Sequence, residues 1–206
     1  PDFINWNHTR PAEAPVVMSA DEKDEPGTEI YSMLVFPYES VYIGLVQVFH
    51  NQPDRSHLDL QLAVSRDTVH FERVGDRTTF LPCGGIGDWD RFNTSIATNP
   101  PIRVGEELRF YYGGRAYRHG PYSGEDKGAP TGGIGLATIP VDRFACVAGS
   151  YDGSRLTTKR LIIKGAGLYL NCRADFGRIT IEVLDQEDHV VAKSAPIEDD
   201  SLGHRV

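Results

Sequence analysis

The residue types best suited to chemistry gather in the segment Asp88–Ala97, where a tryptophan, a carboxylate and hydrogen-bonding side chains lie close together. Trp89 offers an apolar face on which a sugar ring can stack, and Asp90 stands beside Arg91 and Asn93, which can fix hydroxyl groups. This combination suits glycan recognition, because a sugar ring has apolar C–H faces and a hydroxyl edge. A structural interpretation, with Trp89 as a packing anchor and Asp90 capping the next turn, is about equally favoured.

Two other segments carry further candidates. Glu29 and Tyr31 begin an apolar run, so a carboxylate and an aromatic ring stand at its first residues. Arg118 and His119 lie in an aromatic-rich segment that leads into a Gly- and Pro-rich stretch ending at Gly133. Long loops in compact β domains are often functional, and these side chains could hold an anionic or polyhydroxyl ligand. A solvated loop is the competing interpretation.

No metal site or cofactor is predicted from the sequence. His50 and His57 flank a loop, and an isolated loop histidine is more often a surface residue than a ligand. Cys83, Cys146 and Cys172 lie far apart and form no C-x-x-C pair. Neither a zinc site nor a disulfide framework is therefore indicated.

Composition narrows the classes of partner. The chain has 206 residues, 21 Lys and Arg against 29 Asp and Glu, and a net charge of −8. An acidic chain without a basic run is unsuited to nucleic acid or an anionic membrane surface. No run approaches the length of a membrane span and no signal peptide is visible, so the cellular compartment stays open.

The elements that position these residues are predicted to be strands. Apolar and polar residues alternate with a period of two along Tyr42–Phe49, Leu58–Val64 and Leu108–Tyr112. Pairs such as Pro26-Gly27 and Gly113-Gly114 separate many of these runs and are typical of turns. Because no window keeps a helical apolar stripe free of Gly and Pro, we expect an all-β fold.

Internal similarity favours one all-β architecture. Asp2–Trp6 and Asp67–Phe71 share the order Asp, any residue, β-branched, polar and aromatic, and they begin 65 residues apart. Repeated four-stranded units at this spacing favour a β-propeller. The predicted propeller region is 1–150, and its parts are the end of a preceding blade at 1–18, one blade at 29–82 and the next at 93–150.

Three further expectations accompany this organisation. The ring is incomplete, so the remaining blades are expected on another fragment or on further copies of the chain. From residue 154 to 206 the strands become short and separated by Gly-rich turns, which predicts a β-sandwich-like C-terminal segment. The Ser65-Arg66-Asp67 phrase is expected to form a turn in which Asp67 accepts backbone N–H bonds.

Together, Tyr31–Pro37, Trp89-Asp90 and Leu108–Gly114 resemble the later blades of five-bladed propeller proteins related to glycoside hydrolase families 32 and 43. The resemblance implies cleavage of glycosidic bonds by acidic residues delivered from different blades. In family 32 a Glu-Cys-Pro segment precedes a Phe-Pro pair, and aligning that pair with Phe36-Pro37 places Tyr31 at the position of the acid, with Glu29 two residues earlier. Such hydrolysis requires two carboxylates.

The leading hypothesis is a glycoside hydrolase-like protein that acts on or binds a carbohydrate through the propeller channel. Asp90 and Glu29 are its candidate catalytic carboxylates, and the candidate substrate-binding residues are Trp89, Tyr31, Arg91, Asn93, His119 and Arg118. One alternative is a carbohydrate-binding or scaffolding propeller without catalysis. A remoter one is a glycoside phosphorylase whose phosphate site uses Arg115, Arg118 and His119.

Overall fold

The computed structural model describes residues 14–206 except 54–55, 97–98, 120–131, 163 and 166. The predicted all-β class is confirmed: in these residues the regular structure is strand, apart from a single 3-10 turn at Gly75–Arg77. The chain divides into two compact units, Pro1–Ile139 and Pro140–Val206. The limits predicted from the sequence, 1–150 and 154–206, stay a prediction, and the first 13 residues of the predicted preceding blade lie outside the described residues.

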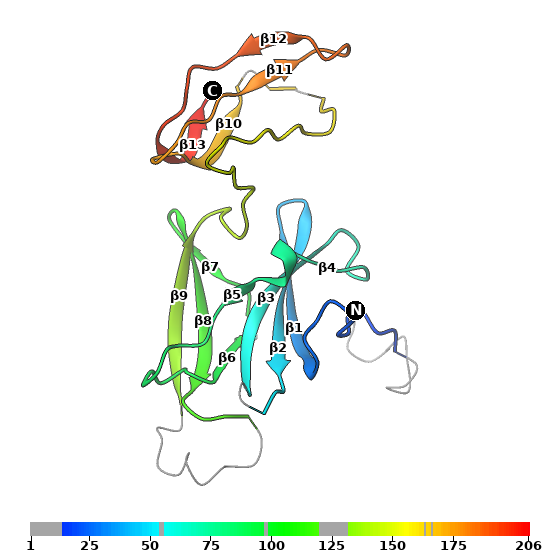
Figure 1. The fold of residues 1–206 in the computed structure, drawn as a ribbon, viewed down its shortest axis with the longest axis vertical. Coiled ribbons are helices and arrows are strands. Elements are labelled where there is room, and N and C mark those ends of the chain that lie inside the picture. Colours follow the sequence, from blue (N-terminus) through cyan, green and yellow to red (C-terminus); the bar gives the residue numbers. More distant parts are fainter. Residues whose placement is uncertain (1–13, 54–55, 97–98, 120–131, 163, 166) are drawn as a thin grey trace. The chain divides into compact units, whose positions relative to one another are not determined.

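The first unit begins with a four-stranded antiparallel meander (Figure 1). Its long strands are β1 (Thr28–Tyr38), β2 (Val41–His50) and β3 (His57–Ser65). Strands β4 (Glu72–Arg73) and β5 (Thr79–Leu81) both pair with β3 in antiparallel fashion, at successive positions along it. The 3-10 turn interrupts this outer edge, so β4 and β5 act as one broken strand.

A second group of strands follows in the same unit. Strands β6 (Asn93–Ile96) and β7 (Ile102–Val104) pair antiparallel with the end and the start of β8 (Glu107–Arg115), and β9 (Gly133–Pro140) pairs with β8 as well. One parallel bridge between β3 and β6 joins the two groups into a nine-stranded mixed sheet. No closed ring of strands is present among the described residues, so the structure shows the all-β class but not the expected propeller.

The long strands form because apolar side chains alternate along them and both faces of the hairpins are covered. On one face Val46, Val48 and Ala63 are fully buried, and Met18, Ile30, Met33 and Phe71 pack against them. The opposite face contributes Leu45, Leu58 and Leu60, each at most 2% exposed. Each such side chain contributes roughly 2 kcal/mol on burial, and strands β1, β2 and β3 carry most of the buried apolar side chains of this unit.

The turn after β3 has the geometry predicted for it. Asp67 Oδ1 accepts the backbone N–H groups of Val69 and His70 at 2.9 and 2.8 Å, and Ser65 Oγ accepts those of Asp67 and Thr68. The backbone N–H and the side chain of His70, with the backbone N–H of Val69, hold the pKa of Asp67 far below its usual range. The predicted role of Asp67 as a turn cap is confirmed.

A cluster of buried charges fixes the segment before β1 onto the outer edge of the meander. Arg73 Nη1 donates to both carboxylate oxygens of Asp24, at 2.7 and 2.8 Å, and Arg77 forms an ion pair with the same carboxylate. The Arg73 and Asp24 side chains are only 7% and 6% exposed. Burial alone would raise the pKa of Asp24, but hydrogen bonds from the Asp21 backbone, Arg77 and Arg73 outweigh it and lower the pKa.

The second unit contains two small antiparallel sheets. Strand β10 (Tyr169–Arg173) pairs with β13 (Asp200–Arg205), and β11 (Glu182–Leu184) pairs with β12 (Val190–Lys193). Arg143 supports the first sheet by donating to Asn171 Oδ1 and to the carbonyl of Cys172. The β-sandwich expected at residues 154–206 stays a prediction, since these sheets have two strands each.

Candidate functional site

Strand register brings the predicted site residues to one end of the first unit. Thr28 pairs with His50, and His50 pairs with His57, which defines this end for β1, β2 and β3. Asn93 bridges to β3 and pairs with Arg115, so β6 begins and β8 ends at the same level. We call this level the strand-end row. The eight residues predicted from the sequence lie no more than four positions from it along the chain.

Three aromatic rings meet beside the strand-end row. The ring centroids of Tyr31, Phe49 and His119 are each 5.1 Å from the other two, with His119 edge-on to both partners. The β1–β2 register shifts between Ile30 and Ser32, so Tyr31 is the extra residue of a β-bulge. Bulges re-aim side chains, and this one places Tyr31 against Phe49. The structure therefore brings together two of the predicted residues, Tyr31 and His119.

A carboxylate lies at the edge of these rings. Glu29 pairs with Phe49 across the β1–β2 ladder, and its Oε1 accepts a hydrogen bond from Asn51 Nδ2 at 3.1 Å. Glu29 is exposed and Tyr31 is 42% exposed. Partial burial and then the negative charge of Glu29 raise the pKa of Tyr31. We call the set Glu29, Tyr31, Phe49, Asn51 and His119 the aromatic corner.

A chain of polar side chains runs from the aromatic corner to Asn93. Ser32 Oγ donates to Gln47 Oε1, and Gln47 Nε2 donates to Ser95 Oγ, both at 3.0 Å. Ser95 Oγ in turn donates to Asn93 Oδ1 at 2.6 Å. Asn93 is only 5% exposed, and its side chain is connected to β2 through Ser95 and Gln47. Its predicted contact with a substrate stays a prediction.

The two predicted arginines share one aromatic ring. The guanidinium carbons of Arg91 and Arg118 lie 4.7 and 5.6 Å from the centroid of the Phe92 ring, within the range of a cation–π interaction. Arg118 also donates to the carbonyl of Pro53, and Ser56 Oγ donates to the carbonyl of His119. These contacts hold the segment after β8 against the β2–β3 connection, which positions His119 in the aromatic corner.

Trp89 and Asp90 form a separate group with Tyr112. Tyr112 Oη donates to Asp90 Oδ2 at 2.8 Å, and the Trp89 and Tyr112 rings stack with centroids 5.7 Å apart. Asp90 is 9% exposed. Burial, followed by the hydrogen bond to Asp90, raises the pKa of Tyr112 to about 12, so its hydroxyl stays protonated at neutral pH. The two candidate carboxylates therefore have different hydrogen-bond partners, Tyr112 for Asp90 and Asn51 for Glu29.

Glycines form the surface against which Trp89 packs. A Cβ atom at Gly114 would lie 2.5 Å from Trp89 Cζ3 and 2.5 Å from Asp90 Cβ, and one at Gly133 would lie 3.1 Å from Trp89 Cε3. The indole therefore packs closely on the backbone of β8 and β9. This packing matches the structural interpretation of Trp89, and the role of the indole in stacking on a sugar stays a prediction.

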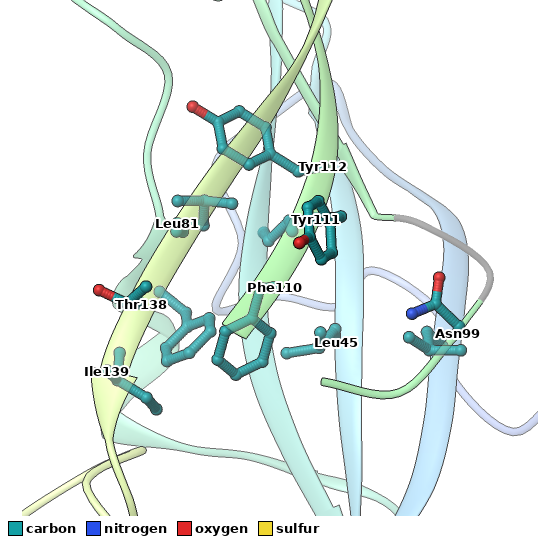
Figure 2. Close-up of a pocket in the computed structure, with 12 residues that line it drawn as sticks. Leu45, Leu81, Asn99, Phe110, Tyr111, Tyr112, Thr138 and Ile139 are labelled. Carbon is teal, nitrogen blue, oxygen red and sulfur yellow. The ribbon is translucent and has the colours of Figure 1, made fainter. Parts of the chain in front are cut away.

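A cavity of the first unit is lined by one member of these groups, Tyr112. It measures about 130 Å³ and is lined by side chains from β1, β2, β3, β5, β8 and β9, including Leu45, Phe110 and Ile139 (Figure 2). In Figure 2 the Tyr112 hydroxyl points away from the aliphatic side chains that line the cavity. None of the eight predicted site residues lines it. A gap of this size and apolar character is a packing feature of the core.

Two groups of side chains have the composition and spacing of metal ligands. His50, His57 and Asp59 lie at the strand-end row, and Asp185, Glu187 and His189 lie in the connection between β11 and β12. Asp185 Oδ1 already accepts backbone N–H bonds from Glu187 and His189. The second group is therefore a capped turn, whereas the first joins two paired strands.

No family model and no curated protein matches the chain. Two solved structures match part of it. A BT0996 RGII complex is 15% identical with a TM-score of 0.45, and the match covers 62% of this chain and 36% of that one. An N-acetylgalactosamine deacetylase from F. plautii, in complex with blood group B trisaccharide, is 20% identical with a TM-score of 0.40, over 57% of this chain and 34% of that one.

This chain thus spans about a third of the length of either structure. At these identities and TM-scores, neither match identifies the function of this chain. In the part of the chain that the structure describes, no helix has the length and apolar character needed to cross a membrane.

Proposed function

We propose that this chain binds carbohydrate at the aromatic corner. The observation that carries the proposal is the exposed Tyr31 ring beside the Glu29–Asn51 pair. Binding sites commonly combine aromatic surface with a few well-placed polar groups. Tyr31 supplies the surface on which the C–H face of a sugar would rest, and Phe49 and His119 hold that ring in place.

The polar edge of the corner suits sugar hydroxyls. A carboxylate has about four acceptor sites, and Asn51 uses one of those on Glu29. Glu29 can therefore accept hydrogen bonds from two neighbouring hydroxyls, and bonds to an ionised acceptor are stronger than neutral ones. The Asn51 amide adds both donor and acceptor capacity. Sugars with vicinal hydroxyls are the chemical class that this pairing fits.

A second candidate is glycoside hydrolysis within a propeller. It is favoured by one observation, namely that Glu29 and Asp90 both lie near the strand-end row, which in a propeller would face the channel. Hydrolysis requires two carboxylates on opposite sides of the scissile bond. Glu29 is exposed, and Asp90 is held by Tyr112. Asp90 would therefore have to release or share that hydrogen bond to act as an acid or base.

Carbohydrate binding is tested with the full chain on a glycan array, followed by calorimetric titration of the best oligosaccharide. We expect Tyr31→Ala to weaken binding at least about tenfold, the equivalent of 1.4 kcal/mol. Tyr111→Ala is the matched control, because Tyr111 is 43% exposed on β8 and lies outside the corner. Equal affinities of both variants and the parent chain would overturn the proposal, as would the absence of any glycan ligand.

Hydrolysis is tested on aryl glycosides and on the oligosaccharide ligand, comparing Glu29→Gln with Asp90→Asn. Loss of turnover in both variants with binding retained would support the two-carboxylate mechanism. Full activity in either variant would remove that residue from it. Phosphate-dependent release of a sugar phosphate would instead favour the phosphorylase, although Arg115 and Arg118 lie on two different aromatic rings, Tyr117 and Phe92.

A further inference from the structure

Three metal-ligand side chains converge at the end of the β2–β3 hairpin. His50 and His57 are a cross-strand pair, and Asp59 follows His57 by two residues, so its side chain lies on the same face of β3. One ligand atom from each of the three side chains lies within 4.8 Å of the others. His50 Nε2 and Asp59 Oδ1 are 3.1 Å apart.

We propose that His50, His57 and Asp59 bind a divalent transition-metal ion of the zinc class. Two imidazoles and one carboxylate suit zinc and its neighbours, whereas calcium and magnesium prefer oxygen ligands. Ligand atoms of a tetrahedral zinc ion are roughly 3.4 Å apart. The separation of His50 Nε2 and Asp59 Oδ1 is close to this spacing, and all three ligand atoms lie within 4.8 Å of one another, so side-chain rotations are enough to form the site.

The two imidazoles lie side by side, and binding one ion requires a rotation of at least one of them. Their rings are stacked, with centroids 4.4 Å apart and planes only 10° from parallel. Because the lone pair of an imidazole nitrogen lies in the ring plane, one ring must rotate out of this stack before both rings can bind the same ion beside the Asp59 carboxylate. The arrangement comes from the hairpin register itself, because His50 and His57 are the last pair of the β2–β3 ladder.

A second contact orients the carboxylate. Thr79 Oγ1, on β5, donates to Asp59 Oδ2 at 2.6 Å, which leaves Oδ1 directed at His50. Metal-binding carboxylates are usually held in this way by a hydrogen bond to the oxygen that does not face the metal. Asp59 is 4% exposed, and the His50 side chain is 18% exposed, so the site is anchored in the core and reachable from solvent.

Three protein ligands leave a fourth tetrahedral position for water, as in zinc sites that take part in reactions rather than in closed structural sites. The site is separate from the aromatic corner, because Glu29–Phe49 and Thr28–His50 are successive pairs and their side chains face opposite sides of the sheet. Asn51 directly follows His50, so a bound metal would also steady the partner of Glu29.

The test is a calorimetric titration of the chelator-treated full chain with Zn²⁺, with Co²⁺ absorption and the shift of the melting temperature as further readouts. We expect one ion per chain, and a loss of affinity of at least about tenfold in His57→Gln. Thr79→Val, which keeps the ligands, is expected to weaken binding by about ten- to a hundredfold. Asp59→Asn removes the third ligand and is expected to weaken binding as well. If it fails to fold, His57→Gln and Thr79→Val still test the proposal.

The matched control is His189→Gln, which alters the capped turn between β11 and β12. We expect this variant to bind Zn²⁺ like the parent chain. Zinc binding that is lost in His189→Gln and kept in His57→Gln would overturn the proposal. The proposal would also be overturned if the parent chain takes up no Zn²⁺. Full Zn²⁺ affinity of both His57→Gln and Thr79→Val would overturn it too.

Discussion

The contact between Trp89 and the glycines of β8 and β9 gives a sharp prediction for Gly114→Ala. The new methyl group would lie 2.5 Å from both Trp89 Cζ3 and Asp90 Cβ, and 2.9 Å from Trp89 Cη2. These separations are about 1 Å below normal carbon–carbon contact, so the segment carrying Trp89 and Asp90 must move away. Overpacking of this kind costs about 1–3 kcal/mol, and here it also disturbs the Tyr112–Asp90 hydrogen bond.

Gly113→Ala is the control, because a Cβ at Gly113 meets nothing within 4 Å and its backbone does not require glycine. The free energy of unfolding is measured with urea, and Trp89 emission is followed in a Trp6→Phe background, since the chain has two tryptophans. We expect destabilisation and a shifted emission only in Gly114→Ala. Equal stability of the two variants, with unchanged Trp89 emission, would refute the packing described for the 83–92 segment.

Three further predictions concern the core, the buried charges and the cysteines. Leu45→Ala, at a side chain 2% exposed that borders the cavity, should lower the free energy of unfolding by about 3 kcal/mol, measured by urea denaturation. Asp24→Asn should cost roughly 3 kcal/mol at neutral pH, because it leaves the buried Arg73 guanidinium without its carboxylate partner, whereas Arg77 keeps its ion pair with Asp21. The folded pKa of Asp24 lies below its usual 3.8, so this stabilisation is full above about pH 4 and is lost as the pH falls further, a loss that acid titration should not find in the variant. Exposed Cys146 should react with a thiol reagent at neutral pH well before Cys83 and before buried Cys172. Burial, followed by the charge of Asp59, raises the pKa of Cys83 to about 12. Faster labelling of Cys83 than of Cys146 would contradict its described surroundings.

The strands themselves could be predicted because they are long, rich in apolar and β-branched residues, and separated by turn residues. Tyr42–Phe49 and Leu58–Val64 lie within β2 and β3, where each face is buried against a different set of side chains. The Asp67 turn was also predictable, because the carboxylate caps local backbone groups and needs no distant partner. Local chemistry sufficed in both cases.

The arrangement of the site was harder to predict, because it depends on register and on one bulge. Phe49 reads as an ordinary apolar strand residue, yet the bulge at Tyr31 turns the two rings against each other. Tyr112 likewise reads as part of the β8 alternation, and its bond to Asp90 depends on how the 83–92 segment folds over β8. Such contacts join residues far apart in sequence, so spacing alone carries no signal for them.

The group formed by His50, His57 and Asp59 shows the same limit. Their spacing matches no metal motif along the chain, and only the hairpin register makes His50 a neighbour of the other two. A sequence pattern that includes the turn length between paired strands would have found it. The predicted propeller is a different case. Whether strands close into a ring depends on how several sheets pack together, and the pattern of one hairpin carries no information about that.

The most direct test of carbohydrate binding at the aromatic corner is a crystal structure of the full chain with its best oligosaccharide ligand from the glycan array. We expect one sugar ring to lie on Tyr31, with hydroxyl groups within hydrogen-bond distance of Glu29 and Asn51. A ligand seated instead against Trp89, or held only by residues of the Pro140–Val206 unit, would contradict the assignment of this site.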